Sequence, residues 1–407
     1  MDERIVILGA GQAAGQAVVS LRQLGHAGPI TVLGDERYPP YQRPPLSKKF
    51  LAGDLEVERL YVKPEGWYAE KGATLRLGCP AESLDVAGHR VRMADGNHVD
   101  YDRLLVCTGS AVRRIPVPEV NLPGIHYLRT IDDVRAIQPS LREGARLVVV
   151  GGGYIGLEVA AIARELGLDV TVVEMADRVM ARVVCPEISA FYQALHEAAG
   201  VRLRLGTPVQ GFEGGDRVQG VRVSAGEVLP ADLVIIGAGI VPVTGIAADA
   251  GLTCDDGICV DEYAATSAAH VYAAGDCTRH PNALLGRRLR LESVHNALEQ
   301  ARTAAASLCG QPRAYTQLPW FWSDQYDVKL QIAGLTGEHD RVVVRGDPEQ
   351  RSFSACYLRD DLLLAVDAVN QPRDFMQAKK LLADGPVRVN LARLADASAS
   401  LRDAAED

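Results

Sequence analysis

Three glycines in the middle of the chain have the spacing of a phosphate-binding turn. Gly151, Gly153 and Gly156 form a G-x-G-x-x-G motif directly after the apolar run 147–150. The first glycine of such a motif permits a tight turn, the second lets the backbone approach a pyrophosphate, and the third lets a helix pack closely against a strand. Glu174, 18 residues after the last glycine, would accept hydrogen bonds from ribose hydroxyls and repel a 2′-phosphate. The stretch therefore predicts a dinucleotide site that favours NAD over NADP.

A second copy of this pattern stands at the start of the chain. Gly9, Gly11 and Ala14 follow the apolar run 5–8, and Asp35 supplies the acid. Alanine replaces the third glycine here, which such motifs allow. Because both copies keep their acid, we expect two occupied dinucleotide sites rather than a duplicated domain that has lost one site.

Each motif requires a strand before it, a helix after it and a second strand that ends at the acid. Apolar runs stand at the expected places, at 5–8, 30–33, 147–150 and 170–173. The stretches 102–109 (DRLLVCTG) and 232–239 (DLVIIGAG) then repeat an acid, an apolar run and a glycine, one after each motif. We predict an α/β fold with two Rossmann-like domains that form an internal duplication.

The C-terminal part has a different pattern. We expect short strands with alternating polar and apolar residues at 328–332, 341–345, 352–357 and 362–366. A helix is expected near 374–382. These elements together predict a third domain, of the α+β class. The tail 395–407 is expected to be frayed.

Composition argues against several classes of protein. The 407 residues carry a net charge of −9, so nothing indicates nucleic acid as a partner. We find no membrane span and no signal peptide, and we expect a cytoplasmic protein. The eight cysteines include no C-x-x-C pair, and the spacing of Cys254 and Cys259 is interpreted as chance. The histidines lack metal-binding spacing, so no metal site is predicted.

The stretch 38–48 (YPPYQRPPLSK) contains four prolines and is predicted to be a stiff loop. Arg43 and Lys48 on this loop are candidates to contact phosphates or a flavin ring, although a plain linker remains possible. Asp276, after Gly275 at the end of another predicted strand, could hold ribityl or ribose hydroxyls.

These stretches together resemble the FAD-dependent, NADH-specific ferredoxin reductases, of the putidaredoxin, rhodocoxin and biphenyl dioxygenase reductase kind. The resemblance covers nearly the whole chain in order, and it rests on PPLSK at 44–48, DRLLVCTG, YLRT at 127–130, GGGYIGLEVAA at 151–161, AGDC at 274–277, ESVHNALEQAR at 292–302, WFWSDQYD at 320–327 and AVDAVN at 365–370. It implies a glutathione-reductase-like fold. The FAD-binding domain would be split between 1–112 and 245–322, with an NAD-binding domain at 113–244 and a C-terminal domain at 323–407.

Site residues follow from the motifs and the resemblance together. Those assigned to FAD are Gly9, Gly11, Ala13, Ala14, Asp35, Arg43, Lys48, Ala81, Thr108, Gly109, Arg129, Asp276 and Val294. Those assigned to NAD are Gly151, Gly153, Ile155, Gly156, Glu158, Glu174 and Gly237. Ala81 and Val294 would act mainly through backbone, so only the resemblance selects them.

The implied reaction is hydride transfer from NADH to FAD, followed by single-electron transfer to a 2Fe–2S ferredoxin that serves a cytochrome P450 or a Rieske-type oxygenase. Lys48 and Glu158 would meet near the flavin, although a solvated helix glutamate is an equally good interpretation of Glu158. Trp320 and Trp322 would either pack in a core or cover the flavin edge that faces the ferredoxin. An acidic ferredoxin would dock on basic residues, for which the candidates are Arg287, Arg288, Arg290, Arg302, Lys379 and Lys380.

Other flavoprotein classes fit less well. Disulfide reductases need a dithiol, and NADH peroxidases and oxidases need one redox cysteine, in the region that 38–48 occupies here, which contains no cysteine. An NADH-binding protein of the apoptosis-inducing-factor kind would share the fold and the Lys48–Glu158 pair. Monodehydroascorbate reductase remains as a small-substrate alternative.

Overall fold

Residues 3–337 and 339–406 are described by the computed structural model, in which the chain divides into two units. Unit 1 comprises Met1–Gln42, Val57–Ala111 and Val241–Pro319, and unit 2 comprises Arg43–Glu56, Val112–Ile240 and Trp320–Asp407. Strands β8 (Ser110–Val112) and β17 (Ile240–Pro242) lie where the chain passes between them. Unit 2 thus contains most of the predicted NAD-binding domain together with the predicted C-terminal domain, and the three-domain division stays a prediction.

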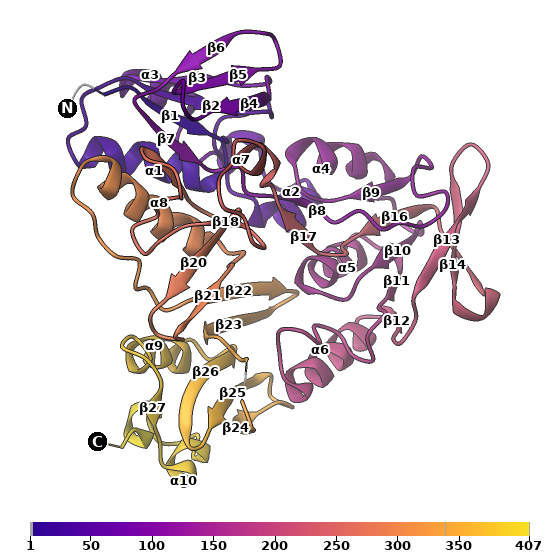
Figure 1. Ribbon diagram of the computed structural model, residues 1–407. Coiled ribbons are helices and arrows are strands. Elements are labelled where there is room, and N and C mark those ends of the chain that lie inside the picture. Colours follow the sequence, from indigo (N-terminus) through magenta and orange to yellow (C-terminus); the bar gives the residue numbers. More distant parts are fainter. Residues whose placement is uncertain (1–2, 338, 407) are drawn as a thin grey trace. The chain divides into compact units, whose positions relative to one another are not determined.

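Unit 1 is built on a parallel sheet with the order β19-β7-β1-β2-β3 (Figure 1). Its strands are β1 (Ile5–Leu8), β2 (Ile30–Leu33), β3 (Ala73–Arg76), β7 (Arg103–Val106) and β19 (Val271–Ala273). All four residues of β1 are buried, as expected for a strand covered on both faces. Helices α1 (Gln12–Gln23) and α8 (Val294–Leu308) pack against each other, and α8 supplies small buried residues at Ala301, Ala304 and Ala305.

The remaining elements of unit 1 are short. One small sheet, β4-β5-β6, is antiparallel, and a second, β18-β20-β21, is mixed, because β18 pairs with β20 in parallel. The strands are β4 (Ala81–Asp85), β5 (Arg90–Met93), β6 (His98–Asp100), β18 (Ile258–Cys259), β20 (Thr278–Asn282) and β21 (Arg287–Leu289). The helical pieces are η2 (Val57–Leu60), α3 (Glu65–Glu70) and α7 (Gly245–Asp249).

Unit 2 repeats the parallel sheet, in the order β12-β11-β10-β16-β9. Its strands are β9 (Ile125–Tyr127), β10 (Arg146–Val150), β11 (Asp169–Val173), β12 (Arg202–Arg204) and β16 (Leu233–Ile236). The pairing of β10 with β16 matches that of β1 with β7, which confirms the predicted duplication. The two copies differ in their outermost strand. Along the chain, β9 comes before the second glycine motif (the second fingerprint, 151–156), whereas β19 comes after the first glycine motif (the first fingerprint, 9–14).

The repeated acids of the two sheets have a structural role. Asp102 accepts hydrogen bonds from the backbone N–H (2.6 Å) and the guanidinium (2.8 Å) of Arg4, and these bonds lower the pKa of Asp102 to about 2. Asp232 accepts the corresponding bonds from Arg146, at 2.9 and 2.6 Å. Each acid thus ties its own strand to the start of the neighbouring central strand.

Further elements of unit 2 surround its sheet. The helical pieces are η1 (Pro44–Ser47), α2 (Lys49–Ala52), α4 (Ile131–Ile137), η3 (Gln138–Ser140), α5 (Tyr154–Glu165), α6 (Pro186–Ala198) and η4 (Ser224–Gly226). A small antiparallel sheet contains β13 (Val209–Gly214), β14 (Val218–Val223) and β15 (Val228–Pro230).

The C-terminal part of unit 2 is an antiparallel sheet with flanking helices, as predicted. The sheet has the order β22-β23-β26-β25-β24, with β27 beside β26, and the strands are β22 (Trp320–Gln325), β23 (Val328–Gly334), β24 (Arg341–Asp347), β25 (Ser352–Arg359), β26 (Leu362–Val369) and β27 (Val387–Arg388). The helical pieces are α9 (Pro372–Leu381), α10 (Leu391–Ala395) and η5 (Leu401–Ala404). The predicted fold class is therefore confirmed, although β22 was not predicted as a strand.

The C-terminal tail is packed, so the expectation that it is frayed was wrong. Leu401 and Ala404 are both fully buried. Only a few apolar residues interrupt the polar and alanine-rich tail, and η5, which carries the two buried residues, packs against α9 and α10. Asp407 lies outside the described residues.

Arg345 on β24 holds this tail in place. Its guanidinium donates to the backbone carbonyls of Leu394 (2.9 Å) and Ala399 (2.8 Å) and to the carboxylate of Asp374 (3.0 Å). The arginine side chain is 2% exposed and that of Asp374 is 10% exposed, so this ion pair is screened from water.

Asp367 on β26 is a buried acid in the same sheet. One carboxylate oxygen accepts a hydrogen bond from the Tyr357 hydroxyl at 2.5 Å, and that hydroxyl in turn accepts one from the Cys185 backbone N–H. Burial raises the pKa of Asp367 from 3.8 to about 7, and the bond from Tyr357 offsets part of this rise.

Replacing Arg345 with Met is expected to lower the free energy of unfolding of the C-terminal sheet by about 3–5 kcal/mol, because Asp374 keeps a buried, unpaired charge. Native-state hydrogen exchange of β24 and β25 measures this change. Arg341 is on the same strand as Arg345 and forms an exposed ion pair with Asp361. Arg341→Met should therefore lower the free energy of unfolding by about 1 kcal/mol or less. Equal losses in the two variants would contradict the assigned role of Arg345.

The pKa of Asp367 predicts a pH dependence of stability. Because the folded state holds the proton more tightly than the unfolded chain, this contribution is present below pH 4 and is lost as the pH rises toward 7, by about 4 kcal/mol at most. Unfolding measured across this range should show that Asp367→Asn lacks the decline. The exposed Asp327→Asn variant should retain it, and parallel curves for wild type and Asp367→Asn would contradict the prediction.

Candidate functional site

The first fingerprint lies at the carboxyl edge of the sheet in unit 1. Gly9 has φ +109°, and a Cβ on it would lie 2.2 Å from the carbonyl oxygen of Cys107, so only glycine fits. This approach brings the fingerprint beside Thr108 and Gly109, which follow β7. Gly275, directly before Asp276, lies within van der Waals reach of Ala13. The structure thus brings together three stretches that the sequence assigned to FAD.

Both fingerprints leave a helix N-terminus open. Gly11 is the N-cap of α1 and Gly153 is the N-cap of α5, and no side chain caps either helix. A Cβ on either glycine would have no neighbouring atom within 4 Å. By contrast, Ser293 caps α8 with its hydroxyl, and Thr130 caps α4. Open space before uncapped N–H groups fits a pyrophosphate, so these residues fit the two dinucleotides.

The second fingerprint repeats the packing of the first. A Cβ on Gly151 would lie 2.5 Å from the Gly237 carbonyl oxygen, and one on Gly156 would lie 2.0 Å from that of Gly151. The Glu174 carboxylate accepts hydrogen bonds from the backbone N–H groups of Gly152 (2.6 Å) and Ala176 (2.8 Å). Its negative charge is therefore held at the edge of the nucleotide site.

The remaining residues assigned to the cofactors lie in both units. In unit 1, Asp35 is exposed after β2, while Ala81 begins β4 and Val294 begins α8. In unit 2, the Arg43 guanidinium donates to the Arg129 carbonyl at 2.7 Å.

Ile155 departs from the apolar helix pattern. The sequence assigned it to NAD, and its side chain is 41% exposed in the first turn of α5. Exposure at the fingerprint helix suits a ligand contact better than a core position.

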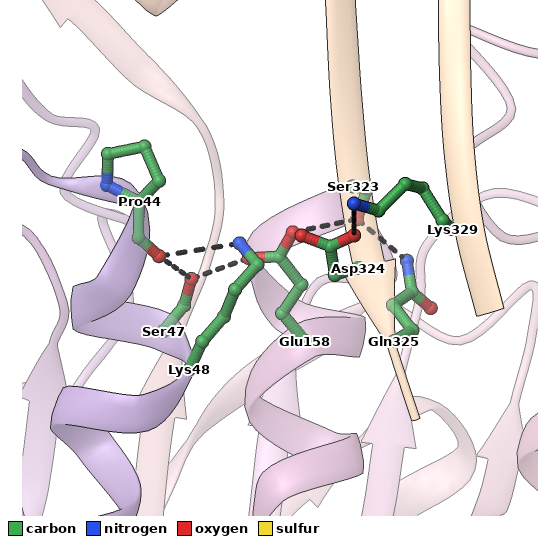
Figure 2. A network of polar contacts seen from close by, with 8 residues as sticks. All are labelled: Pro44, Ser47, Lys48, Glu158, Ser323, Asp324, Gln325 and Lys329. Carbon is green, nitrogen blue, oxygen red and sulfur yellow. Dashed lines mark hydrogen bonds and ion pairs between the residues drawn. The ribbon is translucent and has the colours of Figure 1, made fainter. Parts of the chain in front are cut away.

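Glu158 is the centre of a buried polar network within unit 2 (Figure 2). It is 4% exposed, so the solvated-glutamate interpretation was wrong. One carboxylate oxygen accepts hydrogen bonds from Lys48 Nζ (2.6 Å) and Ser47 Oγ (2.5 Å), and the other accepts one from Ser323 Oγ (2.7 Å). The expected contact between Lys48 and Glu158 is therefore present, and two serines that sequence reasoning missed complete it.

The proline-rich loop has a structural explanation in this network. Pro44 and Pro45 begin the turn η1, which suits their restricted φ, and the chain then enters α2 at Lys49. The Pro44 carbonyl accepts further bonds from Lys48 Nζ (3.3 Å) and Ser47 Oγ (3.4 Å). The stiff turn thus presents both donors to Glu158.

The two tryptophans lie together on β22. The ring centroids of Trp320 and Trp322 are 5.5 Å apart, and both side chains are half-buried. Lys379 Nζ lies 4.7 Å from the centroid of the Trp320 ring, in a cation–π contact. A predicted docking residue therefore contacts a predicted electron-transfer residue.

The arginine candidates for docking are partly engaged within the chain. Arg290 forms ion pairs with Asp256 and Glu292, and its side chain is 14% exposed. Arg302 pairs with Glu299, while Arg288 is exposed and donates to two backbone carbonyls. Arg290 is thus the weakest of the docking candidates described here by their contacts.

The described residues were also searched for metal-binding clusters, membrane-spanning helices and disulfide bonds. Among residues 3–337 and 339–406, we find no group of three His, Cys, Asp or Glu side chains that could hold a metal ion. Nor does any helix there have the length and apolarity needed to cross a bilayer. All eight cysteines are free of disulfide bonds. Cys254 forms an isolated backbone β-bridge with Ile258.

Comparisons with known proteins agree with this architecture. Residues 3–301 match the family model for pyridine nucleotide-disulphide oxidoreductases, and residues 320–405 match a reductase C-terminal domain. Rhodocoxin reductase of Rhodococcus erythropolis is 46% identical, with 93% of this chain and 89% of that protein covered. Putidaredoxin reductase of Pseudomonas putida is 43% identical, with 99% and 96% covered.

A solved structure matches over the same range. The crystal structure of the covalent putidaredoxin reductase–putidaredoxin complex contains a chain with a TM-score of 0.96 and 42% identity, with 99% of this chain and 98% of that chain covered. Two fingerprints, a shared C-terminal domain and matches over nearly the full length lead to one conclusion. The chain belongs to the pyridine nucleotide-disulphide oxidoreductase family.

Proposed function

We propose that this protein is an NADH-dependent ferredoxin reductase that delivers electrons to a 2Fe–2S ferredoxin for a cytochrome P450 or Rieske-type oxygenase. FAD supplies the chemistry, since a flavin accepts a hydride and releases its electrons one at a time. The observation that carries the proposal is the buried ion pair of Lys48 with Glu158, a residue of the helix that begins at the NAD fingerprint.

The protein residues contribute charge and position. The Lys48 ammonium is a fixed positive charge that stabilises negative charge gained by a flavin on reduction. Glu158 orients this ammonium, and the uncapped N-terminus of α5 holds the phosphates of NADH. Glu174 selects NADH, because its charge repels a 2′-phosphate.

Thiol chemistry is disfavoured by the positions of the cysteines. The loop 38–48 contains none, and burial raises the pKa of the thiols of Cys107, Cys277 and Cys356. Such thiols are poor nucleophiles. This supports electron transfer without a redox disulfide.

The partner follows from the relatives and from one surface. Two relatives are named putidaredoxin reductase and rhodocoxin reductase, and one solved structure is the covalent complex of putidaredoxin reductase with putidaredoxin. Lys379 over Trp320, with Lys380 beside it, offers positive charge next to an aromatic side chain for an acidic ferredoxin. The unpaired cysteines support a reducing, cytoplasmic location.

The function is tested with the FAD-loaded protein, NADH or NADPH, and cytochrome c, with and without a 2Fe–2S ferredoxin. We expect NADH-supported reduction that requires the ferredoxin. Ferredoxin-independent turnover or a preference for NADPH would contradict the proposal. Turnover of monodehydroascorbate would favour that alternative, and slow NADH oxidation without any acceptor activity would favour a protein of the apoptosis-inducing-factor kind.

Replacing Lys48 with Met is expected to lower the limiting rate of flavin reduction by NADH by about tenfold to a hundredfold, because a charged hydrogen-bond donor is lost. Stopped-flow absorbance of the flavin measures this rate. Lys49→Met, at the exposed neighbouring position, is the control and should leave the rate unchanged. A normal rate in the Lys48 variant would remove this residue from the mechanism.

Replacing Glu174 with Gln is expected to raise kcat/KM for NADPH relative to NADH by about tenfold, because the repulsive charge is removed while a hydrogen-bond acceptor remains. Steady-state kinetics with both nucleotides give the ratio. Glu165→Gln, at the exposed far end of α5, should not change it. An unaltered ratio in the Glu174 variant would show that another residue selects the nucleotide.

A further inference from the structure

A continuous line of polar side chains extends from Glu158 on α5 along the edge strand β22 to α6 and Tyr326, all within unit 2. Ser323 Oγ accepts a hydrogen bond from Gln325 Nε2 (3.2 Å), and Gln325 Oε1 lies 2.9 Å from His196 Nε2. His196 Nδ1 lies 3.3 Å from the Tyr326 hydroxyl. Ser323, Gln325 and His196 are at most 1% exposed. The reductase function proposed above does not account for this line.

The donors in this line all point toward Glu158. The Gln325 amide donates to Ser323, so its oxygen faces His196 and must accept there. His196 therefore carries its proton on Nε2, and Nδ1 accepts from Tyr326. Burial lowers the pKa of His196, which agrees with a neutral ring that has one donor and one acceptor. The Ser323 hydroxyl in turn donates a hydrogen bond to the Glu158 carboxylate.

We propose that Ser323, Gln325 and His196 are positioning residues that fix the Glu158 carboxylate, and through it the Lys48 ammonium, for hydride transfer. This inference rests on the proposed function, in which Lys48 serves the flavin. A line of neutral donors orients the carboxylate without cancelling its charge, so the carboxylate still attracts Lys48. Gln325 cannot easily pass a proton along the line, which makes positioning rather than proton transfer its role.

The strength of this arrangement depends on burial. In a low-dielectric interior each hydrogen bond is stronger than in water, and a half-satisfied network is costly, so the side chains favour one arrangement. The serine and the glutamine come from β22 and the histidine from α6, whereas Glu158 is on α5. The line thus couples the C-terminal sheet to the two helices of the NAD-binding region.

The main test compares Ser323→Ala with Ser354→Ala in the FAD-loaded protein. Ser354 is a matched control, because its buried hydroxyl also donates to a buried carboxylate, that of Asp374 at 3.0 Å. Ser323→Ala should lower the limiting rate of flavin reduction by NADH about tenfold, with the apparent Kd for NADH changed by less than about twofold. It should also lower the flavin midpoint potential by about 30 mV, which corresponds to a tenfold change in the equilibrium constant of a two-electron couple. Ser354→Ala should change neither quantity.

Two further variants keep the proposal testable if Ser323→Ala does not fold. Ser323→Thr retains the hydroxyl and should keep the rate, whereas Gln325→Met removes the middle of the line at similar volume and should lower it. Nitrogen NMR of the His196 ring reports the tautomer independently of turnover. We expect Nε2–H in the wild type and its loss in Gln325→Met.

The outcomes separate the two proposals. Wild-type potential and rate in Ser323→Ala, or an Nδ1–H tautomer of His196 in the wild type, would overturn the positioning role while leaving the reductase function intact. Failure of the wild type to reduce ferredoxin with NADH would overturn the function, even if flavin reduction by NADH still depended on Ser323.

Discussion

The buried charge of Glu158 is the constraint on which the arrangement of unit 2 depends. A carboxylate removed from water is strongly unfavourable unless charges and donors surround it. Lys48, Ser47 and Ser323 supply them from the loop turn and from β22, which are 110, 111 and 165 residues away in sequence. Three segments must therefore meet at one point for unit 2 to fold.

The duplication explains how one fold holds two nucleotides with different tasks. Both sheets share the order of all strands except the outermost one, a repeated arginine–aspartate tie and an uncapped helix at the glycine turn. Only the second helix carries a buried acid two residues beyond the last glycine of its motif, whereas the first has Gln16 at the position that Glu158 occupies. The local change that distinguishes the two copies is therefore the residue that binds Lys48.

Sequence reasoning succeeded where the constraint is local. Gly9 and Gly151 are dictated by close approach of the neighbouring backbone, and apolar runs such as β1 are dictated by burial on both faces. It failed where contacts are distant. Nothing in the sequence distinguishes Ser323 from other serines before the fold brings it to Glu158 on α5, and His196 is one of nine histidines.

The central claim is that Lys48 and Ser323 act on the reaction through the same carboxylate. A double-mutant cycle of Lys48→Met and Ser323→Ala, followed by the limiting rate of flavin reduction, tests it most directly. We expect strong non-additivity: Ser323→Ala lowers the rate in the wild type but has little further effect once Lys48 is Met. Fully additive effects of the two substitutions would contradict it.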